Sequence, residues 1–263
     1  MKNRFAPERI LVTGASGGLG GALARHYARP GVHLSLWGRD VARLSVVAAA
    51  CRAAGATAEP RSLDLTDLDA ALAALAAEDA AGPIDLAILA AGQGDIRAHG
   101  DRIEDPALVA RLSAVNFSAP ATIAAALATR MTARGHGRIV LIGSAAAFHA
   151  LPFAAAYSGT KAGLARFADA LRLAARDHGV IVTLVSPGFI DTEAGRRVPG
   201  AKPMLIQPEI AAARIAQAAA AGRAHLILPW PFALLRAFDR ILPRRLRDRL
   251  LSGLAPPDRS PRR

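Results

Sequence analysis

The sequence is poor in cysteine, metal-ligand patterns, aromatic residues and long apolar runs. Its single cysteine, Cys51, excludes a disulfide within the chain and a cluster of thiolate metal ligands. The seven histidines are scattered without ligand spacing, so we expect no metal. Aromatic residues make up 5%, which argues against an aromatic-rich binding surface. No uninterrupted apolar run reaches the roughly 18 residues of a spanning helix, and no apolar signal region follows the N-terminus. We therefore expect a soluble, cytoplasmic protein.

Lysine is also scarce, because 30 of the 33 basic residues are arginine. The formal net charge of +12 is unevenly spread: residues 222–263 hold ten arginines and three aspartates, a surplus of seven, and the other five charges are spread over residues 1–221. Such a balance is typical of chains that bind nucleic acid, an anionic membrane or an anionic ligand, and equally of a solvated arginine-rich surface. We expect no nucleic-acid partner.

What is present is a regular alternation of short apolar runs and helical spacing. With 52% hydrophobic residues, the 263-residue chain is long enough to bury a large core. Continuous apolar runs predict strands at 9–13, 32–37, 57–63, 84–89, 138–142, 180–185 and 225–228. Helical spacing lies between them, at 18–29, 40–54, 67–79, 104–131, 153–178 and 208–221.

This alternation is typical of a parallel sheet covered on both faces. We predict an α/β, doubly wound Rossmann fold with a seven-stranded parallel sheet. Residues 1–228 would form this domain. Residues 229–263 would form a basic amphipathic extension with a disordered end at 256–263. Sites in such sheets lie beyond the carboxyl ends of the strands.

A glycine-rich loop, Thr13-Gly14-Ala15-Ser16-Gly17-Gly18-Leu19-Gly20, joins the first strand to the first helix. Glycines allow a sharp turn and a close approach, and the N–H groups of a helix N-terminus favour a pyrophosphate. The spacing matches neither G-x-G-x-x-G nor a Walker A loop. A glycine-rich turn without a ligand is the alternative.

Further motif residues follow this loop in a characteristic order and spacing along the chain. They are Asn116, Ser144, the Y-x-x-x-K of Tyr157 and Lys161, and Pro187-Gly188 before Thr192. With the T-G-x-x-x-G-x-G pattern of the loop, the set resembles the short-chain dehydrogenase/reductase family over residues 9–228. One departure is Leu89 in Leu89-Ala90-Ala91-Gly92, where that family usually has asparagine. We expect a packing substitute and retained cofactor binding.

Tyr157 and Lys161 are four residues apart, so both project from one helix face. A nearby ammonium would lower the phenol pKa from its usual value of about 10. The resemblance implies an oxidoreductase in which Tyr157 is the general acid/base and Lys161 also binds the nicotinamide ribose. It further implies that Ser144 orients the substrate oxygen and that Asn116 holds a water in a relay to Lys161.

The second strand ends at Gly38, where an acid would select NAD, and Arg39 follows. A guanidinium suits a 2′-phosphate, so we favour NADP(H) over NAD(H). Asp40 is the predicted N-cap of the next helix, and Asp64-Leu65 matches the family's adenine contact. The expected cofactor-binding residues are Gly14, Ser16, Gly18, Leu19, Gly20, Arg39, Asp64, Leu65, Gly92, Tyr157, Lys161, Pro187, Gly188, Ile190 and Thr192.

Two segments bear on the substrate and partners. By resemblance, residues 189–207 form a substrate lid. Beyond residue 228, Leu234, Leu235, Phe238, Ile241 and Leu242 form an apolar helical stripe that we expect to be largely buried. The covering surface would be the protein body, a partner subunit or an anionic membrane, and we favour protein.

The activity we expect is hydride transfer between NADP(H) and a carbonyl or secondary alcohol. Two alternatives stay open: a non-enzymatic NADP-binding regulator, and a peripheral membrane reductase of a lipid-like 3-oxo substrate. We also expect a homodimer or homotetramer formed through the long helix that carries Tyr157, because small residues there permit close approach. Those residues are Ala154, Ala155, Gly159, Ala162 and Ala170.

Overall fold

Seven parallel strands form one sheet in the computed structural model, which describes residues 5–94, 101, 103–197 and 200–253. The sheet order is β3-β2-β1-β4-β5-β6-β7, which confirms the predicted seven-stranded parallel sheet. The predicted disorder at 256–263 lies outside the described residues. The strands are β1 (Arg9–Thr13), β2 (His33–Gly38), β3 (Thr57–Ser62), β4 (Leu86–Leu89), β5 (Gly137–Ile142), β6 (Val180–Pro187) and β7 (His225–Leu228).

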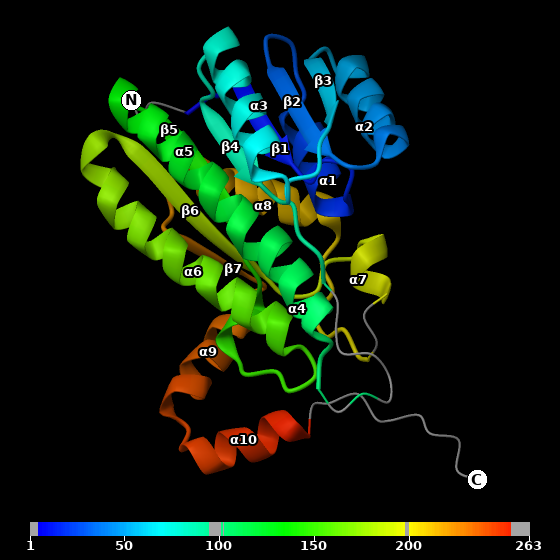
Figure 1. Cartoon of the computed structure of the whole chain (residues 1–263), viewed down its shortest axis with the longest axis vertical. Coiled ribbons are helices and arrows are strands. Elements are labelled where there is room, and N and C mark those ends of the chain that lie inside the picture. Colours follow the sequence, from blue (N-terminus) through cyan, green and yellow to red (C-terminus); the bar gives the residue numbers. More distant parts are fainter. Residues whose placement is uncertain (1–4, 95–100, 102, 198–199, 254–263) are drawn as a thin grey trace.

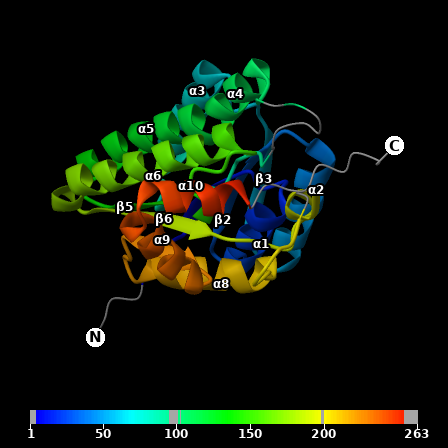
Figure 2. The ribbon, with the colours of Figure 1, turned by 90° about the horizontal axis from the view of Figure 1, so that it is seen from below.

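Helices cover both faces of the sheet (Figures 1 and 2). One apolar cluster joins α1 (Gly18–Tyr27), α2 (Val41–Ala53) and α8 (Pro208–Ala220) to the sheet. A second cluster joins α3 (Leu68–Ala81), α5 (Ala119–Arg134) and α6 (Ala155–Ala175) to its other face. Many members of both clusters are alanines, and their small side chains let the helices lie close to the strands.

The edge strand β3 departs from the sequence expectation. A buried strand is predicted at 57–63, but most β3 side chains are exposed and only Ala58 is buried. Because β3 pairs only with β2, its outer edge faces solvent. Pro60, which lacks an N–H, is tolerated in such an edge strand.

The single helix predicted over 104–131 is divided into three parts. α4 (Pro106–Ser113) leads through a π-helical turn, η1 (Ala114–Ser118), into α5. By length and composition alone, the stretch Pro106–Arg134 could cross a membrane. Its inner face is nevertheless part of the protein core, where Ile123, Leu127 and Met131 are fully buried.

Three short helical segments lie within the predicted lid or next to the long helix and β5. α6 ends in a 3₁₀ turn, η3 (Arg176–His178), and α7 (Glu193–Arg197) lies within the predicted lid. Another 3₁₀ turn, η2 (Ala145–Phe148), follows β5.

The segment after β7 forms two helices, α9 (Pro231–Ile241) and α10 (Arg244–Ser252), separated at Pro243. The body of the chain does not cover Leu234, whose side chain is 52% exposed, so its expected burial by a partner subunit or a membrane stays a prediction. Phe232 faces the body instead, and a residue two positions later lies about 200° around the helix. Leu242 is half-buried; the side chains of Leu235, Phe238 and Ile241 lie outside the described residues.

Candidate active site

The loops after β1 and β4 meet where the strand order reverses, at the carboxyl edge of the sheet. Gly14 has φ +69°, and a Cβ there would lie 2.7 Å from the Ala91 Cα. The Ala91 N–H donates to the Thr13 Oγ1 at 3.3 Å. Only glycine at position 14 allows the two loops to approach this closely.

The first turn of α1 lies beside this junction and has no side-chain cap, because its N-cap is Gly17. A Cβ on Gly18 would lie 2.6 Å from the Thr192 Cγ2, so Thr192 of the lid segment packs over that turn. Gly20 packs against the Gly14 carbonyl, and Leu19 is half-buried. Uncapped N–H groups, a glycine surface and a threonine above them fit a pyrophosphate group.

The end of β2 is shaped by Gly38 and Ser16. A Cβ on Gly38 would lie 2.7 Å from the Ser16 Oγ, so a larger residue cannot enter without displacing Ser16. Arg39 follows with an exposed side chain. Asp40 accepts from the Arg43 N–H at 3.0 Å, which confirms it as the N-cap of α2.

Asp64 and Leu65 follow the neighbouring strand β3. Hydrogen bonds from the backbone and side chain of Thr66 lower the pKa of Asp64, and the Arg39 guanidinium lowers it further. Leu65 is buried. Arg39 and Asp64 are therefore close enough to interact at this end of the sheet.

Ser144 and Tyr157 lie at the carboxyl end of β5 and in the first turn of α6. Ser144 is buried, caps η2 by accepting from the Ala146 N–H at 3.1 Å, and hydrogen-bonds Tyr157. Burial raises the pKa of Tyr157, and the Ser144 hydrogen bond opposes this rise only in part. The net shift is opposite to the predicted lowering, because loss of hydration dominates and the opposing contribution comes from Ser144 rather than from Lys161.

Lys161 lies one turn after Tyr157 with 4% of its side chain exposed. Its Nζ donates to the Ile142 carbonyl at 3.0 Å, and burial lowers its pKa to about 8. The position of a Cβ on Gly92 would be 3.3 Å from this Nζ and 3.1 Å from the Asn116 Oδ1. A side chain at position 92 would press on both groups.

The π-helical turn η1 directs the fully buried Asn116 to the loop after β4. Its Oδ1 accepts from the Gln93 N–H at 2.8 Å, and its Nδ2 donates to the Gln93 carbonyl at 2.9 Å. This pair of bonds fixes the backbone beside Gly92. In the same region Leu89 is 1% exposed in the apolar core, which confirms the expected packing substitute.

The predicted lid follows the end of β6 at Pro187 and Gly188. Gly188 donates its N–H to the Leu228 carbonyl at 2.6 Å, and a Cβ on it would meet the Phe232 ring. Ile190 bridges to Ile206. The lid arginines are neutralised locally by lid acids, in the pairs Arg196–Asp191 and Arg197–Glu193.

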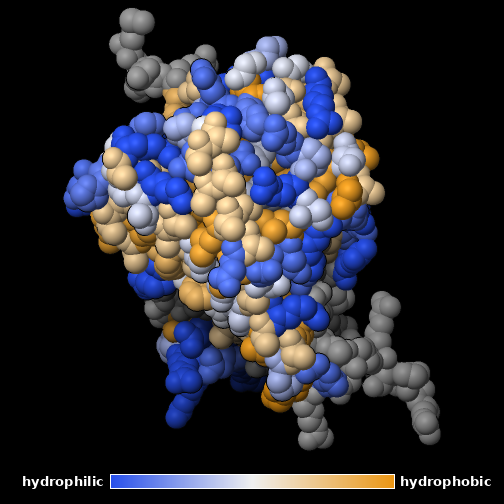
Figure 3. Space-filling view, turned by 45° about the horizontal axis from the view of Figure 1, so that its top comes forward, coloured by the Kyte–Doolittle hydropathy of each residue, from blue (hydrophilic) through white to orange (hydrophobic). Residues whose placement is uncertain are grey.

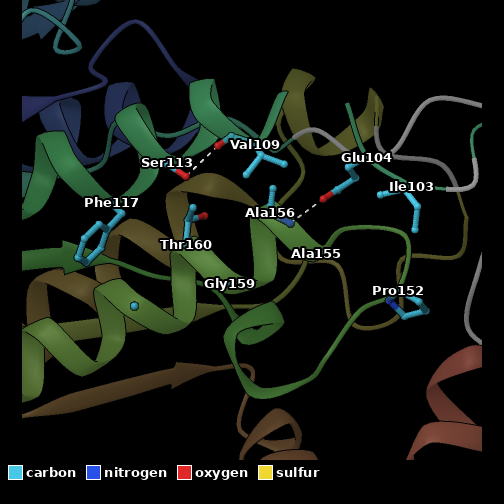
Figure 4. Close-up of a pocket in the computed structure, with 11 residues that line it drawn as sticks. Ile103, Glu104, Val109, Ser113, Phe117, Pro152, Ala155, Ala156, Gly159 and Thr160 are labelled. Atoms are coloured by element: carbon cyan, nitrogen blue, oxygen red, sulfur yellow. Dashed lines mark hydrogen bonds between the residues drawn. The ribbon is translucent and has the colours of Figure 1, made fainter. Parts of the chain in front are cut away.

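Sequence reasoning missed Gln93, Glu104 and Phe232. The buried Glu104 accepts the Ala156 N–H at 2.7 Å through its Oε2, next to Tyr157 (Figure 4). The sequence places Glu104 at the start of the helix predicted over 104–131, which gives no indication of a contact with α6. Among the described residues, no group of three or more His, Cys, Asp or Glu side chains could hold a metal ion.

A family model for short chain dehydrogenases matches residues 8–202. The chain belongs to the short-chain dehydrogenase/reductase family. An uncharacterized oxidoreductase from Myxococcus xanthus is 36% identical over 90% of this chain and 94% of its own length. These matches make the chain an oxidoreductase of that family.

Two solved structures of short-chain enzymes share the fold. A short-chain dehydrogenase from Sphingobium yanoikuyae in complex with NADPH has 28% identity and a TM-score of 0.77, over 97% of this chain and 99% of that one. A variant of the actinorhodin polyketide ketoreductase with NADPH has 26% identity and a TM-score of 0.76, over 84% of this chain and 95% of that one.

Proposed function

We propose that this short-chain dehydrogenase/reductase transfers a hydride between NADP(H) and a carbonyl or secondary alcohol. The observation that carries the proposal is the group at one sheet edge: the Ser144 hydroxyl bonded to Tyr157, with the buried Lys161 one helical turn away. Oxygen orientation, proton transfer and a cation are the three protein functions that carbonyl reduction needs.

The cofactor would lie along the carboxyl edge. Gly14, Ser16, Gly18, Leu19 and Gly20 would hold its pyrophosphate on α1. The remaining contacts would come from Arg39, Asp64 and Leu65 at the adenosine end, and from Gly92, Tyr157, Lys161, Pro187, Gly188, Ile190 and Thr192 toward the nicotinamide. When bound, the cofactor supplies or accepts the hydride.

In the reductive direction, the Tyr157 hydroxyl donates its proton to the substrate oxygen as negative charge develops there. The raised pKa of Tyr157 keeps this hydroxyl protonated at neutral pH. Ser144 holds the same oxygen by a hydrogen bond. Lys161 stabilises the tyrosinate that remains, and Asn116 holds the Gln93 backbone and a water in the relay to Lys161.

Three observations support NADP(H) over NAD(H). Ser16 leaves no room for an acidic side chain at position 38, and Arg39 supplies a guanidinium at the adjacent position. Both solved relatives named above contain NADPH.

Because the lid arginines are already paired, a neutral carbonyl compound suits the site better than an anionic one.

Turnover tests the proposal. A panel of ketones, aldehydes and 3-oxoacyl compounds is assayed with NADPH by loss of its absorbance. Tyr157→Phe removes only the hydroxyl, so we expect kcat/KM to fall at least about 100-fold while NADPH still binds through its other contacts. Tyr27→Phe is the matched control, because Tyr27 is buried in the core with a pKa of about 12 and lies in α1.

The alternative of a non-enzymatic NADP-binding regulator predicts another result. Such a protein would bind NADPH but turn over no member of the panel, and its binding would be the same in Tyr157→Phe. That outcome would refute the proposed reaction while leaving the cofactor site in place.

A further inference from the structure

The helices α9 and α10 present apolar residues on two opposite faces. The inner face holds Phe232, which is 9% exposed and contacts Gly188, and Leu251, which is 8% exposed. Leu251 lines a small cavity of about 180 Å³ together with Ala150 and Pro152 of the loop between Ser144 and Tyr157. Packing on the body therefore accounts for one face of these helices.

The other face carries large apolar side chains that the body does not cover. Leu246 and Leu250 are 48% and 55% exposed and lie one turn apart on α10. Leu234 of α9 is 52% exposed, and Trp230, just before α9, is 69% exposed. We call the α10 leucines Leu246 and Leu250, with the arginines described next, the outward face.

Arginines border these leucines. Arg245 and Arg249 are exposed, lie one turn apart, and each directly precedes an exposed leucine. Asp248 pairs with Arg244 and Arg247 at 3.7 and 3.6 Å. Among the described residues, no acidic side chain forms an ion pair with Arg245 or Arg249. Both guanidinium groups are exposed, so a partner can reach them.

The position of α10 matters for what this face can reach. Figures 1 and 2 show α10 beyond the carboxyl edge of the sheet, below the layer formed by α6. Figure 3 shows hydrophilic and hydrophobic residues side by side at the lower end of the molecule, the end where Figure 1 places α10. The outward face and the candidate active site are thus at the same end of the protein.

We propose that the outward face docks on an anionic lipid surface. Half-exposed leucines beside arginines suit the boundary between phospholipid headgroups and acyl chains. The local charge is complementary, since residues 222–263 contain ten arginines and three aspartates. A second copy joined face to face would bring the same arginines together, and like-charge repulsion opposes that arrangement.

The test is co-sedimentation of the full chain with vesicles of phosphatidylcholine alone or mixed with phosphatidylglycerol. We expect binding to the mixed vesicles only, weakened by salt. In Arg245→Gln with Arg249→Gln, binding should fall about 25-fold, at roughly fivefold per arginine. In Leu246→Ser with Leu250→Ser, it should fall about tenfold or more.

Matched controls carry the same changes on exposed residues elsewhere. Val41→Ser with Val46→Ser alters α2, whose two valines are 61% and 70% exposed, and Arg61→Gln with Arg176→Gln removes two other exposed arginines. Both controls should bind the mixed vesicles like the unchanged chain. Thermal unfolding checks that every variant is folded.

Three results would overturn the proposal. One is no binding to the mixed vesicles. Another is full binding by the leucine variant, which would mean adsorption by charge alone. The third is a lower light-scattering mass for the leucine variant than for the unchanged chain, which would identify a second copy as the occupant. None of these measurements depends on turnover.

Discussion

Lys161 places an ammonium group in the interior, beside the Ile142 carbonyl and Gly92. Burial lowers its pKa to about 8 from the ordinary 10.5. Between these two values the unfolded chain holds a proton that the folded chain has lost. The contribution of Lys161 to the free energy of unfolding therefore rises as pH increases through this window.

For Lys161→Met we predict that this pH dependence disappears. Relative to the variant, the unchanged chain should gain stability between about pH 8 and 10, with a slope of at most about 1.4 kcal/mol per pH unit. Chemical denaturation at several pH values measures it. Lys202→Met is the control, because it removes a lysine of the lid. Parallel curves for the unchanged chain and Lys161→Met would contradict the buried-ammonium interpretation.

Arg39 allows a prediction about cofactor choice. Arg39→Asp places a carboxylate where we propose a 2′-phosphate, so NADPH affinity should drop about 10- to 100-fold. NADH should then be the better cofactor. Titration of each cofactor by fluorescence measures both effects. Arg176→Asp carries the same charge change in η3 and should alter neither affinity. Unchanged NADPH affinity in Arg39→Asp would show that the guanidinium has another role.

For single residues, the sequence predicts which side chains form the candidate site better than it predicts the surroundings of those side chains. Ser144, Tyr157 and Lys161 are recognisable because their spacing along the chain is fixed. The direction of the Tyr157 pKa shift depends on how many segments of the chain bury the hydroxyl. The spacing of nearby residues does not predict that burial. The contacts of Gln93 and Phe232 join residues far apart in the chain, so no short pattern indicates them.

Among the elements, the start of α6 positions Tyr157, and its N-cap residue, Ala154, offers no side-chain hydrogen bond. The buried Glu104 supplies the acceptor from another segment. For Glu104→Ala we predict a loss of about 1 kcal/mol of stability and an approximately tenfold lower kcat, because the first turn loses an anchor. The dissociation constant of NADPH should not change.

Two variants separate a role of Glu104 in positioning Tyr157 from a general effect on the stability of the protein. Glu104→Gln keeps an acceptor oxygen and should restore most of kcat. Asp67→Ala removes the N-cap of α3, where Asp67 accepts from the Ala70 N–H at 3.0 Å, far along the chain from Tyr157. Asp67→Ala should lower the free energy of unfolding by a similar amount without lowering kcat. Equal kcat losses in Asp67→Ala and Glu104→Ala would refute the positioning role.

The order of strands and helices is predictable from the sequence because each buried strand is a continuous apolar run and each helix keeps its own spacing. The π-helical turn is not, since Ala114–Ser118 has the composition of an ordinary helix. The exposure of β3 has a signal in Glu59, Pro60 and Arg61, which suit an edge strand better than an inner one. The place of an element in the sheet decides such details.

For the whole molecule, an apolar groove of about 630 Å³ runs between α4 and the start of α6 (Figure 4). Val109, Phe117, Ala155, Gly159 and Gly163 are among the residues that line it. We predict that a second copy covers this groove, so light scattering at micromolar concentration should give at least the mass of a dimer. A mass of one chain would contradict the prediction.

Gly159→Arg sharpens this test. A Cβ at Gly159 would meet nothing within 4 Å, so the folded single chain can accept a larger residue there. A partner seated in the groove would not, and the variant should therefore have a lower mass than the unchanged chain. Ala49→Arg adds the same side chain to an exposed position of α2 and should leave the mass unchanged.

The two described ends of the chain lie at opposite edges of the sheet. The Phe5 ring packs against the Arg138 guanidinium at the amino end of β5. The Arg138 Cζ lies 3.9 Å from the centroid of the Phe5 ring. Gly253 follows α10, at the carboxyl edge. An affinity tag fused before Phe5 would therefore stay away from both the candidate active site and the outward face. The same tag fused after Gly253 would be attached beside them, where its own charges would compete with any lipid surface.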